Sequence, residues 1–162
     1  MKVAIIMGSK SDLPVMEETT AILKQFGVET EMRVLSAHRC PDEVAAFAKA
    51  AADNGFSAII AGAGMAAHLP GVIASYTTLP VIGVPIDASS LDGIDALLSI
   101  VQMPPGIPVA TVGIGKAGAK NAALLAVEML ALAEPSLKNK LTSFRDDQKK
   151  TILAADKEVK NS

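Results

Sequence analysis

The sequence predicts an α/β fold of three layers, in which helices cover both faces of a parallel sheet. Short apolar runs alternate with helical patterns along the whole 162-residue chain. Most of these runs are apolar throughout, as expected for strands that are buried on both faces. Right-handed crossovers between parallel strands place the intervening helices on the two faces of the sheet.

Five apolar runs, each flanked by turn residues or by polar segments, predict the strands. The second run alternates apolar and charged side chains, which is typical of a strand with one exposed face. The first run ends at Gly8, where the chain passes into a polar loop. The predicted strands, in order, are residues 2–7, 30–34, 57–61, 81–84 and 109–112.

The helices are predicted from apolar periodicity and from residues that start and stop helices. Asp12 is placed to cap the first helix, which tolerates Pro14 in its first turn and ends at Gly27. Asp42 and Glu43 open the second helix, where acidic side chains suit the helix dipole. The predicted helices are residues 13–26, a helix from Asp42 to Asn54, a short helix after the loop at residues 62–71, residues 91–101, an alanine-rich helix from the loop at residues 113–118 to Ala133, and a polar C-terminal helix.

Five parallel strands suit a flavodoxin-like sheet with an additional C-terminal helix. We expect a single domain over residues 1–162, with an α/β core over residues 1–133 and a helical extension over residues 134–162. Hydrophobic residues make up 50% of the sequence and aromatic residues 3%, so small and aliphatic side chains must supply the packing. Apolar surface in excess of one core is usually buried between subunits, which predicts a homo-oligomer.

Charge, hydropathy and cysteine content exclude several classes of protein. A formal net charge of -2 gives no strong field to attract nucleic acid or an anionic membrane. The apolar stretch at residues 58–67 is shorter than the roughly 20 residues of a spanning helix, and the first apolar run is too short for a signal peptide. Cys40 is the only cysteine, so neither an internal disulfide nor a multi-cysteine zinc site is expected. The predicted location is the cytoplasm.

In such sheets ligands bind beyond the carboxyl ends of the strands, which singles out three loops. The first, residues 8–12, can bind an anion through Gly8, its serines and the helix that follows, or can be an ordinary turn that Asp12 caps. In the second, residues 36–39, Arg39 can hold a phosphate or carboxylate while His38 exchanges protons near neutral pH. The alternative there is that His38 caps a helix and Arg39 makes a surface ion pair.

The third loop, residues 62–71, has small residues that would let a flat ring lie against the backbone. It carries His68, the other histidine of the chain, which either contacts a ligand or fixes the loop through a backbone carbonyl. Its start fits a loose dinucleotide fingerprint with Asp87 downstream, so nicotinamide binding is an alternative. Residues 113–118 fit G-x-G-x-x-G more closely, but no further strand follows them, which favours close packing of a helix on the sheet.

Two other chemistries are less well supported. Lys116 is followed by alanine, so the hydroxyl that a P-loop offers to magnesium is missing. Cys40 follows His38 by two residues, but sequence neighbours rarely form the geometry of a nucleophile or metal site, so we interpret it as a spectator thiol.

Six motifs along the chain together resemble the class I N5-carboxyaminoimidazole ribonucleotide mutase family, also called the catalytic subunit of phosphoribosylaminoimidazole carboxylase. The resemblance spans nearly the whole sequence. The motifs are GSKSD at residues 8–12, SAHR at 36–39, AAHLPG at 66–71, IGVP at 82–85, QMPPGIPVAT at 102–111 and GKAGAKNAALLA at 115–126.

The resemblance implies an enzyme of purine synthesis that moves a carboxylate from the exocyclic nitrogen to C4 of an aminoimidazole ribonucleotide, without cofactor or metal. His38 would be the general acid and base. Ser9, Ser11 and Arg39 would hold the phosphate, and Asp12 would accept hydrogen bonds from the ribose. The implied substrate-binding residues are Ser9, Ser11, Asp12, Ser36, Arg39, Gly64 and His68.

The resemblance further implies a homo-octamer, a C-terminal helix that reaches a neighbouring subunit, and functional coupling to an ATP-dependent N5-carboxyaminoimidazole ribonucleotide synthetase. Met65 stands where many relatives have glycine, and Cys40 where threonine is common. The alternatives are a class II-like carboxylase that uses free carbon dioxide, and a nucleotide-binding module without turnover.

Overall fold

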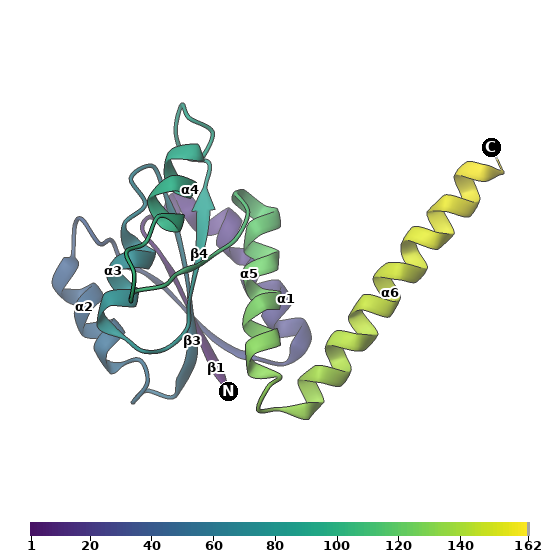
Figure 1. Cartoon of the computed structure of the whole chain (residues 1–162), viewed down its shortest axis with the longest axis horizontal. Coiled ribbons are helices and arrows are strands. Elements are labelled where there is room, and N and C mark those ends of the chain that lie inside the picture. Colours follow the sequence, from purple (N-terminus) through teal and green to yellow (C-terminus); the bar gives the residue numbers. More distant parts are fainter. Residues whose placement is uncertain (162) are drawn as a thin grey trace.

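The computed structural model describes residues 1–161 and contains one five-stranded parallel sheet (Figure 1). The strand order is β2-β1-β3-β4-β5, which confirms the flavodoxin-like prediction. Because chain order reverses between β1 and β3, the loops after these two strands diverge and leave a crevice. The strands are β1 (Lys2–Met7), β2 (Glu29–Val34), β3 (Phe56–Gly64), β4 (Val81–Ile86) and β5 (Ala110–Thr111).

Helices cover both faces of the sheet, and each face has its own apolar core. On one face, Ile5 and Met7 of β1 pack with Leu23 of α1 and with the alanine-rich side of α5. On the other face, Ile6 packs among residues of α2, α3 and α4. Successive side chains of a strand point to opposite faces, so one apolar run supplies both cores. The helices are α1 (Leu13–Phe26), α2 (Pro41–Ala50), α3 (Leu69–Tyr76), α4 (Ile94–Val101), α5 (Gly115–Leu130) and α6 (Pro135–Lys160), with a short 3-10 helix, η1 (Lys10–Asp12), before α1.

The C-terminal helix α6 packs against the core only through its first turns. Leu137 is buried, and Leu141 and Phe144 lie against the core on the α1 and α5 side. Lys140 donates a 2.7 Å hydrogen bond to the carbonyl oxygen of Phe26 at the end of α1. Beyond these contacts the helix projects away from the sheet (Figure 1), and residues 145–160 are exposed.

Several predicted boundaries were wrong where glycine or loop geometry overrides the local pattern. β3 continues to Gly64 instead of ending at residue 61, because Gly62 and Gly64 pair in register with Val84 and Ile86. α4 begins at Ile94 instead of residue 91, because the chain turns at Asp92 and Gly93, which both have positive φ.

Other helix and strand ends differ from the predicted ones by a few residues. α3 already begins at Leu69 within the glycine-rich loop, and α5 already begins at Gly115 within the glycine motif and ends at Leu130 instead of Ala133. The strand predicted over residues 109–112 is reduced to Ala110–Thr111.

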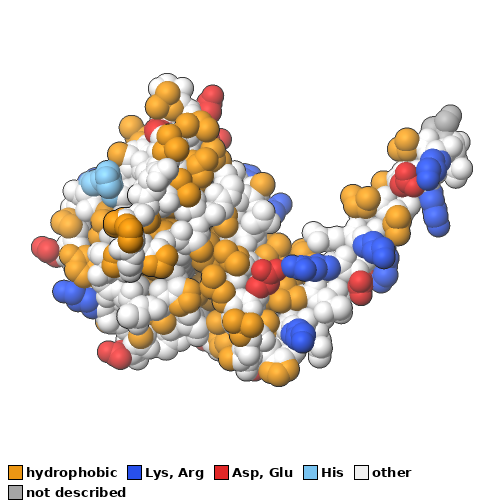
Figure 2. Space-filling view, in the orientation of Figure 1, with side chains coloured by type: hydrophobic (Ala, Val, Ile, Leu, Met, Phe, Trp, Pro, Cys, Tyr) orange, Lys and Arg blue, Asp and Glu red, His pale blue; other side chains and the backbone are white. Residues whose placement is uncertain are grey.

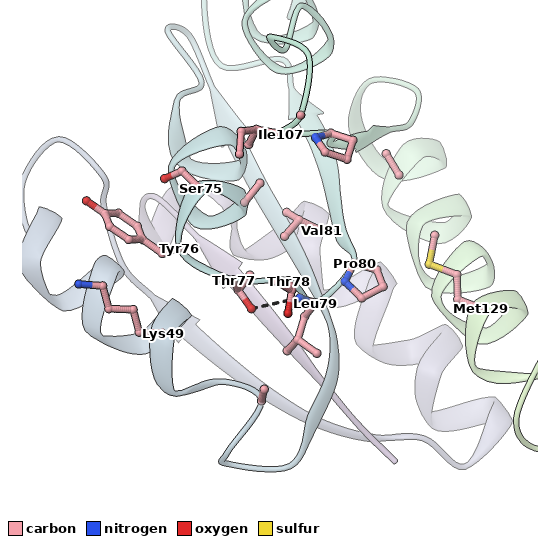
Figure 3. Close-up of a pocket in the computed structure, with 15 residues that line it drawn as sticks. Lys49, Ser75, Tyr76, Thr77, Thr78, Leu79, Pro80, Val81, Ile107 and Met129 are labelled. Atoms are coloured by element: carbon pink, nitrogen blue, oxygen red, sulfur yellow. Dashed lines mark hydrogen bonds between the residues drawn. The ribbon is translucent and has the colours of Figure 1, made fainter.

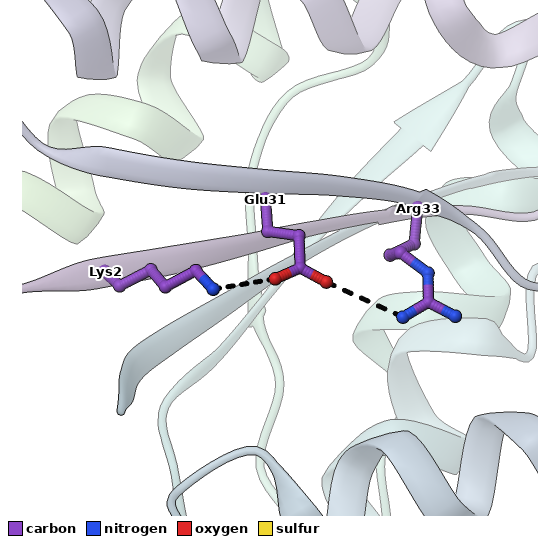
Figure 4. A network of polar contacts seen from close by, with 3 residues as sticks. All are labelled: Lys2, Glu31 and Arg33. Carbon is purple, nitrogen blue, oxygen red and sulfur yellow. Dashed lines mark hydrogen bonds and ion pairs between the residues drawn. The ribbon is translucent and has the colours of Figure 1, made fainter. Parts of the chain in front are cut away.

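A partly buried charged cluster joins the edge strand β2 to the start of β1. The Nζ of Lys2 lies 2.7 Å from one carboxylate oxygen of Glu31, and the Nη1 of Arg33 lies 3.6 Å from the other (Figure 4). The hydrogen bond from Lys2 is the main reason that the pKa of Glu31 is lowered. Charged side chains on an edge strand oppose pairing with the edge of another sheet.

No helix within residues 1–161 is long and apolar enough to cross a membrane.

Candidate active site

The predicted site residues come together in one cavity of about 570 Å³ at the carboxyl ends of the central strands. Loops that follow β1, β2, β3 and β4 all contribute to its lining, and β1 and β3 are the strands between which chain order reverses. This is where the topology of an open α/β sheet places a ligand. The cavity is lined by Gly8, Ser9, Ser11, Asp12, Ser36, Ala37, His38, Arg39, Ala63, Gly64, Met65, Ala66, Ala67, His68, Leu69 and Ala88.

The loop after β1 is folded by its own polar side chains. The carboxylate of Asp12 accepts a 3.0 Å hydrogen bond from the backbone N–H of Ser9, and the hydroxyl of Ser11 donates to that of Ser9 at 2.8 Å. The prediction that Asp12 caps α1 was wrong: it stands at the right position, but its carboxylate turns back to Ser9 in a capping box of η1. Asp12 is buried, and this burial raises the pKa of its carboxyl group.

Arg39 joins the loops that follow β1 and β2. Its Nη2 donates to the carbonyl oxygen of Gly8 at 2.7 Å, and its Nε donates to the hydroxyl of Ser36 at 3.2 Å. The surface ion pair considered for Arg39 is not formed within the described residues. The guanidinium is exposed at the cavity, so it still has N–H groups to offer to an anion.

The two histidines of the chain meet across the cavity. The Nε2 of His38 lies 2.9 Å from the Nδ1 of His68, and the rings are 4.9 Å apart at 72°. The same Nδ1 lies 2.9 Å from the carbonyl oxygen of Ala66. Because a carbonyl oxygen only accepts hydrogen bonds, this contact requires the proton of His68 on Nδ1.

The Nδ1 of His68 lies within hydrogen-bond reach of both the carbonyl oxygen of Ala66 and the Nε2 of His38. With the proton of His68 on Nδ1, the Nε2 of His38 is the acceptor in their contact. The imidazole of His38 is therefore held by His68, and it lines the cavity. The His68 contact with Ala66 is the loop-fixing bond that the sequence suggested, and His68 also lines the cavity.

The part of the cavity lining around Gly64 is apolar and closely packed. A Cβ atom on Gly64 would lie 2.6 Å from the Cβ of Ala88 and 3.1 Å from the carbonyl oxygen of Ile86, so this position requires glycine. The next residue, Met65, has a φ of 56°. A side chain in this left-handed region costs about 1–2 kcal/mol relative to glycine.

Sequence reasoning missed two features of this site. Ala88, from the loop after β4, lines the cavity although no motif marks it. The end of a predicted parallel strand was the only signal that could have located it. The contact between His38 and His68 also had no local signal, since it depends on how loops 30 residues apart are placed.

The other glycine motifs have structural roles here. A Cβ on Gly118 would overlap the carbonyl group of Gly113, so α5 packs closely on the loop that follows β5. The close packing that the motif predicted is present at this contact with the loop, whereas the prediction placed it on the sheet. Cys40 accepts a hydrogen bond from the N–H of Ser36 at 3.1 Å and donates to the carbonyl oxygen of Ser36 at 3.3 Å, so its thiol holds the turn that carries His38.

A second cavity of about 740 Å³ lies near the start of β4, among Lys49, Tyr76, Thr77 and Ile107 (Figure 3). The Nζ of Lys49 stands 5.1 Å from the centre of the Tyr76 ring. This cavity contains none of the predicted site residues and no histidine. Across residues 1–161, no group of three or more His, Cys, Asp or Glu side chains could hold a metal ion.

Comparison with known proteins gives one consistent family. The family described as AIR carboxylase matches residues 2–151. The chain is 60% identical over 149 residues, 92% of this chain and 84% of the relative, to a Pyrococcus abyssi protein named N5-carboxyaminoimidazole ribonucleotide mutase. A Saccharolobus solfataricus protein of the same name is 56% identical over 153 residues, 94% of this chain and 96% of the relative. The crystal structure of Treponema denticola PurE superposes with a TM-score of 0.88 at 30% identity, over 97% of each chain.

Proposed function

Because this chain belongs to the AIR carboxylase family, we propose that it is an N5-carboxyaminoimidazole ribonucleotide mutase. This isomerase converts N5-carboxyaminoimidazole ribonucleotide to 4-carboxy-5-aminoimidazole ribonucleotide in purine synthesis. Beyond the resemblance to named mutases, one observation carries the proposal: the imidazole of His38, held against His68, lies in the same cavity as the loops of Ser9 and Arg39.

The substrate would lie with its phosphate toward the loop after β1 and its imidazole toward the histidines. Ser9 and Ser11 offer hydroxyl groups there, and Arg39 offers a positive charge fixed by its bond to Gly8. Asp12, an acceptor at the edge of this loop, would bind the ribose hydroxyls. Ser36, Gly64 and His68 complete the proposed substrate contacts. The space that a Cβ of Gly64 would take is filled by Ala88, so Gly64 allows the two chain segments to pack closely in the cavity lining.

The reaction moves one carboxylate and one proton in opposite directions. The N–C bond of the carbamate breaks with its electron pair staying on nitrogen, and carbon dioxide is released into the cavity. C4 of the imidazole then attacks the carbon of carbon dioxide, and the C4 proton must leave to restore aromaticity. His38 would remove that proton, and one proton returned to the exocyclic nitrogen completes the balance. These steps use only groups already in the cavity, without cofactor or metal.

Assembly into a homo-octamer is part of the proposal. The side of α4 that faces away from the sheet, together with the loop before it, bears four large apolar side chains at helical spacing, which we call the α4 stripe. Figure 2 shows hydrophobic side chains gathered at the end of the molecule where α4 lies. The stripe consists of Leu91, Ile94, Leu98 and Val101, which are 60%, 51%, 54% and 48% exposed.

We further propose that residues 1–133 form the catalytic unit and that residues 134–162 serve assembly, since the described part of α6 leaves its own core. A carbamate substrate must be made by a carboxylation, which supports functional coupling to an ATP-dependent synthetase. The cytoplasm is the proposed location, in keeping with the single cysteine.

The test follows conversion of N5-carboxyaminoimidazole ribonucleotide by ultraviolet absorbance, without ATP, biotin or metal. We expect the wild type to convert the substrate and His38→Asn to lose roughly a thousandfold or more in kcat while still binding it, because the base is gone and the cavity is kept. Lys49→Gln, in the second cavity, is the matched control and should retain activity. A folded wild type that carboxylates aminoimidazole ribonucleotide with free carbon dioxide but ignores the carbamate would show the carboxylase instead.

A further inference from the structure

Met65 lines the candidate site, yet its backbone is one that favours glycine. Its φ is 56°, and the residue is 59% exposed and lines the cavity. Such outliers persist where the surrounding structure or a function maintains them. Within residues 1–161 only Asp92, with a φ of 51°, shares this left-handed backbone among the non-glycine residues, and it is not part of the cavity lining.

The turn itself does not need a methionine side chain. Directly after it, the carbonyl oxygen of Ala66 accepts the backbone N–H of His68 at 2.8 Å and lies 2.9 Å from its Nδ1, and neither contact involves the side chain of Met65. Glycine would form the same turn with less strain. A reason for methionine must therefore lie in its side chain, an apolar chain that adapts its shape to what it covers.

The proposed reaction passes through carbon dioxide, an intermediate that polar groups bind weakly. After the carbamate N–C bond breaks, carbon dioxide is neutral and small, and an open cavity would lose it to water before C4 attacks it. Retention then depends on an apolar wall. The small side chains of Ala63, Ala66, Ala67 and Ala88 line the cavity. Of the two long apolar side chains in the lining, Leu69 is buried, so Met65 is the exposed one.

We propose that the side chain of Met65 is an apolar cover that retains carbon dioxide against C4 of the substrate until the new bond forms. This inference rests on the mutase function proposed above. The Met65 cover makes no bond to the reacting atoms. Its effect is on the fate of the intermediate: recapture gives the C4 carboxylate, and escape gives aminoimidazole ribonucleotide and free carbon dioxide.

The experiment measures escape directly. Unlabelled N5-carboxyaminoimidazole ribonucleotide is converted in buffer equilibrated with ¹³C-labelled carbon dioxide and carbonic anhydrase. Mass spectrometry then gives the ¹³C content of the product carboxylate and the share of substrate lost as aminoimidazole ribonucleotide. The variants are Met65→Gly, Met65→Asn, which keeps the turn with a short side chain, and Met65→Leu. Asp92→Gly is the matched control, because it relieves the same backbone strain outside the cavity.

We expect Met65→Gly and Met65→Asn to raise both label uptake and substrate loss by roughly threefold or more, because water reaches the cavity. Met65→Leu and Asp92→Gly should match the wild type. Equal label uptake in wild type, Met65→Gly and Met65→Asn would overturn the proposal that Met65 covers the cavity. It would also be overturned if Met65→Gly and Met65→Asn folded but did not convert the substrate. A wild type without conversion would contradict the mutase function instead, before the variants are compared.

Discussion

The glycine motif at residues 113–118 allows a test in which two of its glycines, Gly113 and Gly118, should respond to alanine in opposite ways. In Gly118→Ala the new Cβ would overlap the carbonyl group of Gly113 and lie 3.3 Å from its Cα. The obstacle is backbone, so no side-chain rotation relieves it, and either α5 or the preceding turn must move. α5 contributes buried residues from Gly115 to Leu130 to the core, so such a shift disturbs many contacts.

The magnitude follows from two opposing terms. Overpacking of this kind costs about 3 kcal/mol, whereas alanine favours a helix interior over glycine by about 1 kcal/mol. We therefore expect Gly118→Ala to lower the free energy of unfolding by about 2 kcal/mol, which corresponds to about 4–8 °C in Tm for a chain of this size. Gly113→Ala meets no atom within 4 Å and has no positive φ, so it should be neutral or stabilising by about 0.5 kcal/mol.

Urea denaturation at one fixed protein concentration measures both variants against the wild type. A fixed concentration is needed because association shifts apparent stability. Equal midpoints for Gly118→Ala and Gly113→Ala would refute the packing argument. A loss of mutase activity in Gly113→Ala without loss of stability would show that this motif touches the ligand.

Three further predictions concern single contacts. Burial raises the pKa of Asp12 above 3.8, so the folded state holds this proton more tightly and its contribution to the free energy of unfolding falls as pH rises above 3.8. Asp12→Asn should lose less stability than the wild type as pH rises above 3.8, measured by thermal denaturation; an equal loss in both proteins would contradict the raised pKa. The hydroxyl of Thr19 is buried and donates to the carbonyl oxygen of Ala119 at 3.0 Å, so Thr19→Val should cost about 1 kcal/mol in urea. Thr20→Val is its control, because the buried Thr20 hydroxyl has no partner within the described residues. A larger loss of unfolding free energy in Thr20→Val than in Thr19→Val would contradict a stabilising hydrogen bond from Thr19. Arg39→Lys should raise KM about tenfold with a smaller change in kcat, because one ammonium group cannot bond Gly8 and Ser36 together; an unchanged KM would remove Arg39 from phosphate binding.

The sequence by itself determined the elements and the positions of the site loops. Apolar runs and end signals located the five strands and six main helices, because periodicity and turn residues act within a few neighbouring residues. The rule that ligands bind at the carboxyl ends of parallel strands then selected the loops at Gly8, Ser36 and Gly62 from the sequence alone.

The tertiary structure alone decided how those loops face one another. The order β2-β1-β3 places His38 beside His68 at 2.9 Å and Arg39 beside Gly8 at 2.7 Å. It also buries Asp12 and turns its carboxylate toward Ser9 instead of the end of α1. Local sequence patterns do not record such distances, because strand order and backbone turns such as that at Met65 are fixed by the packing of segments far apart in the chain.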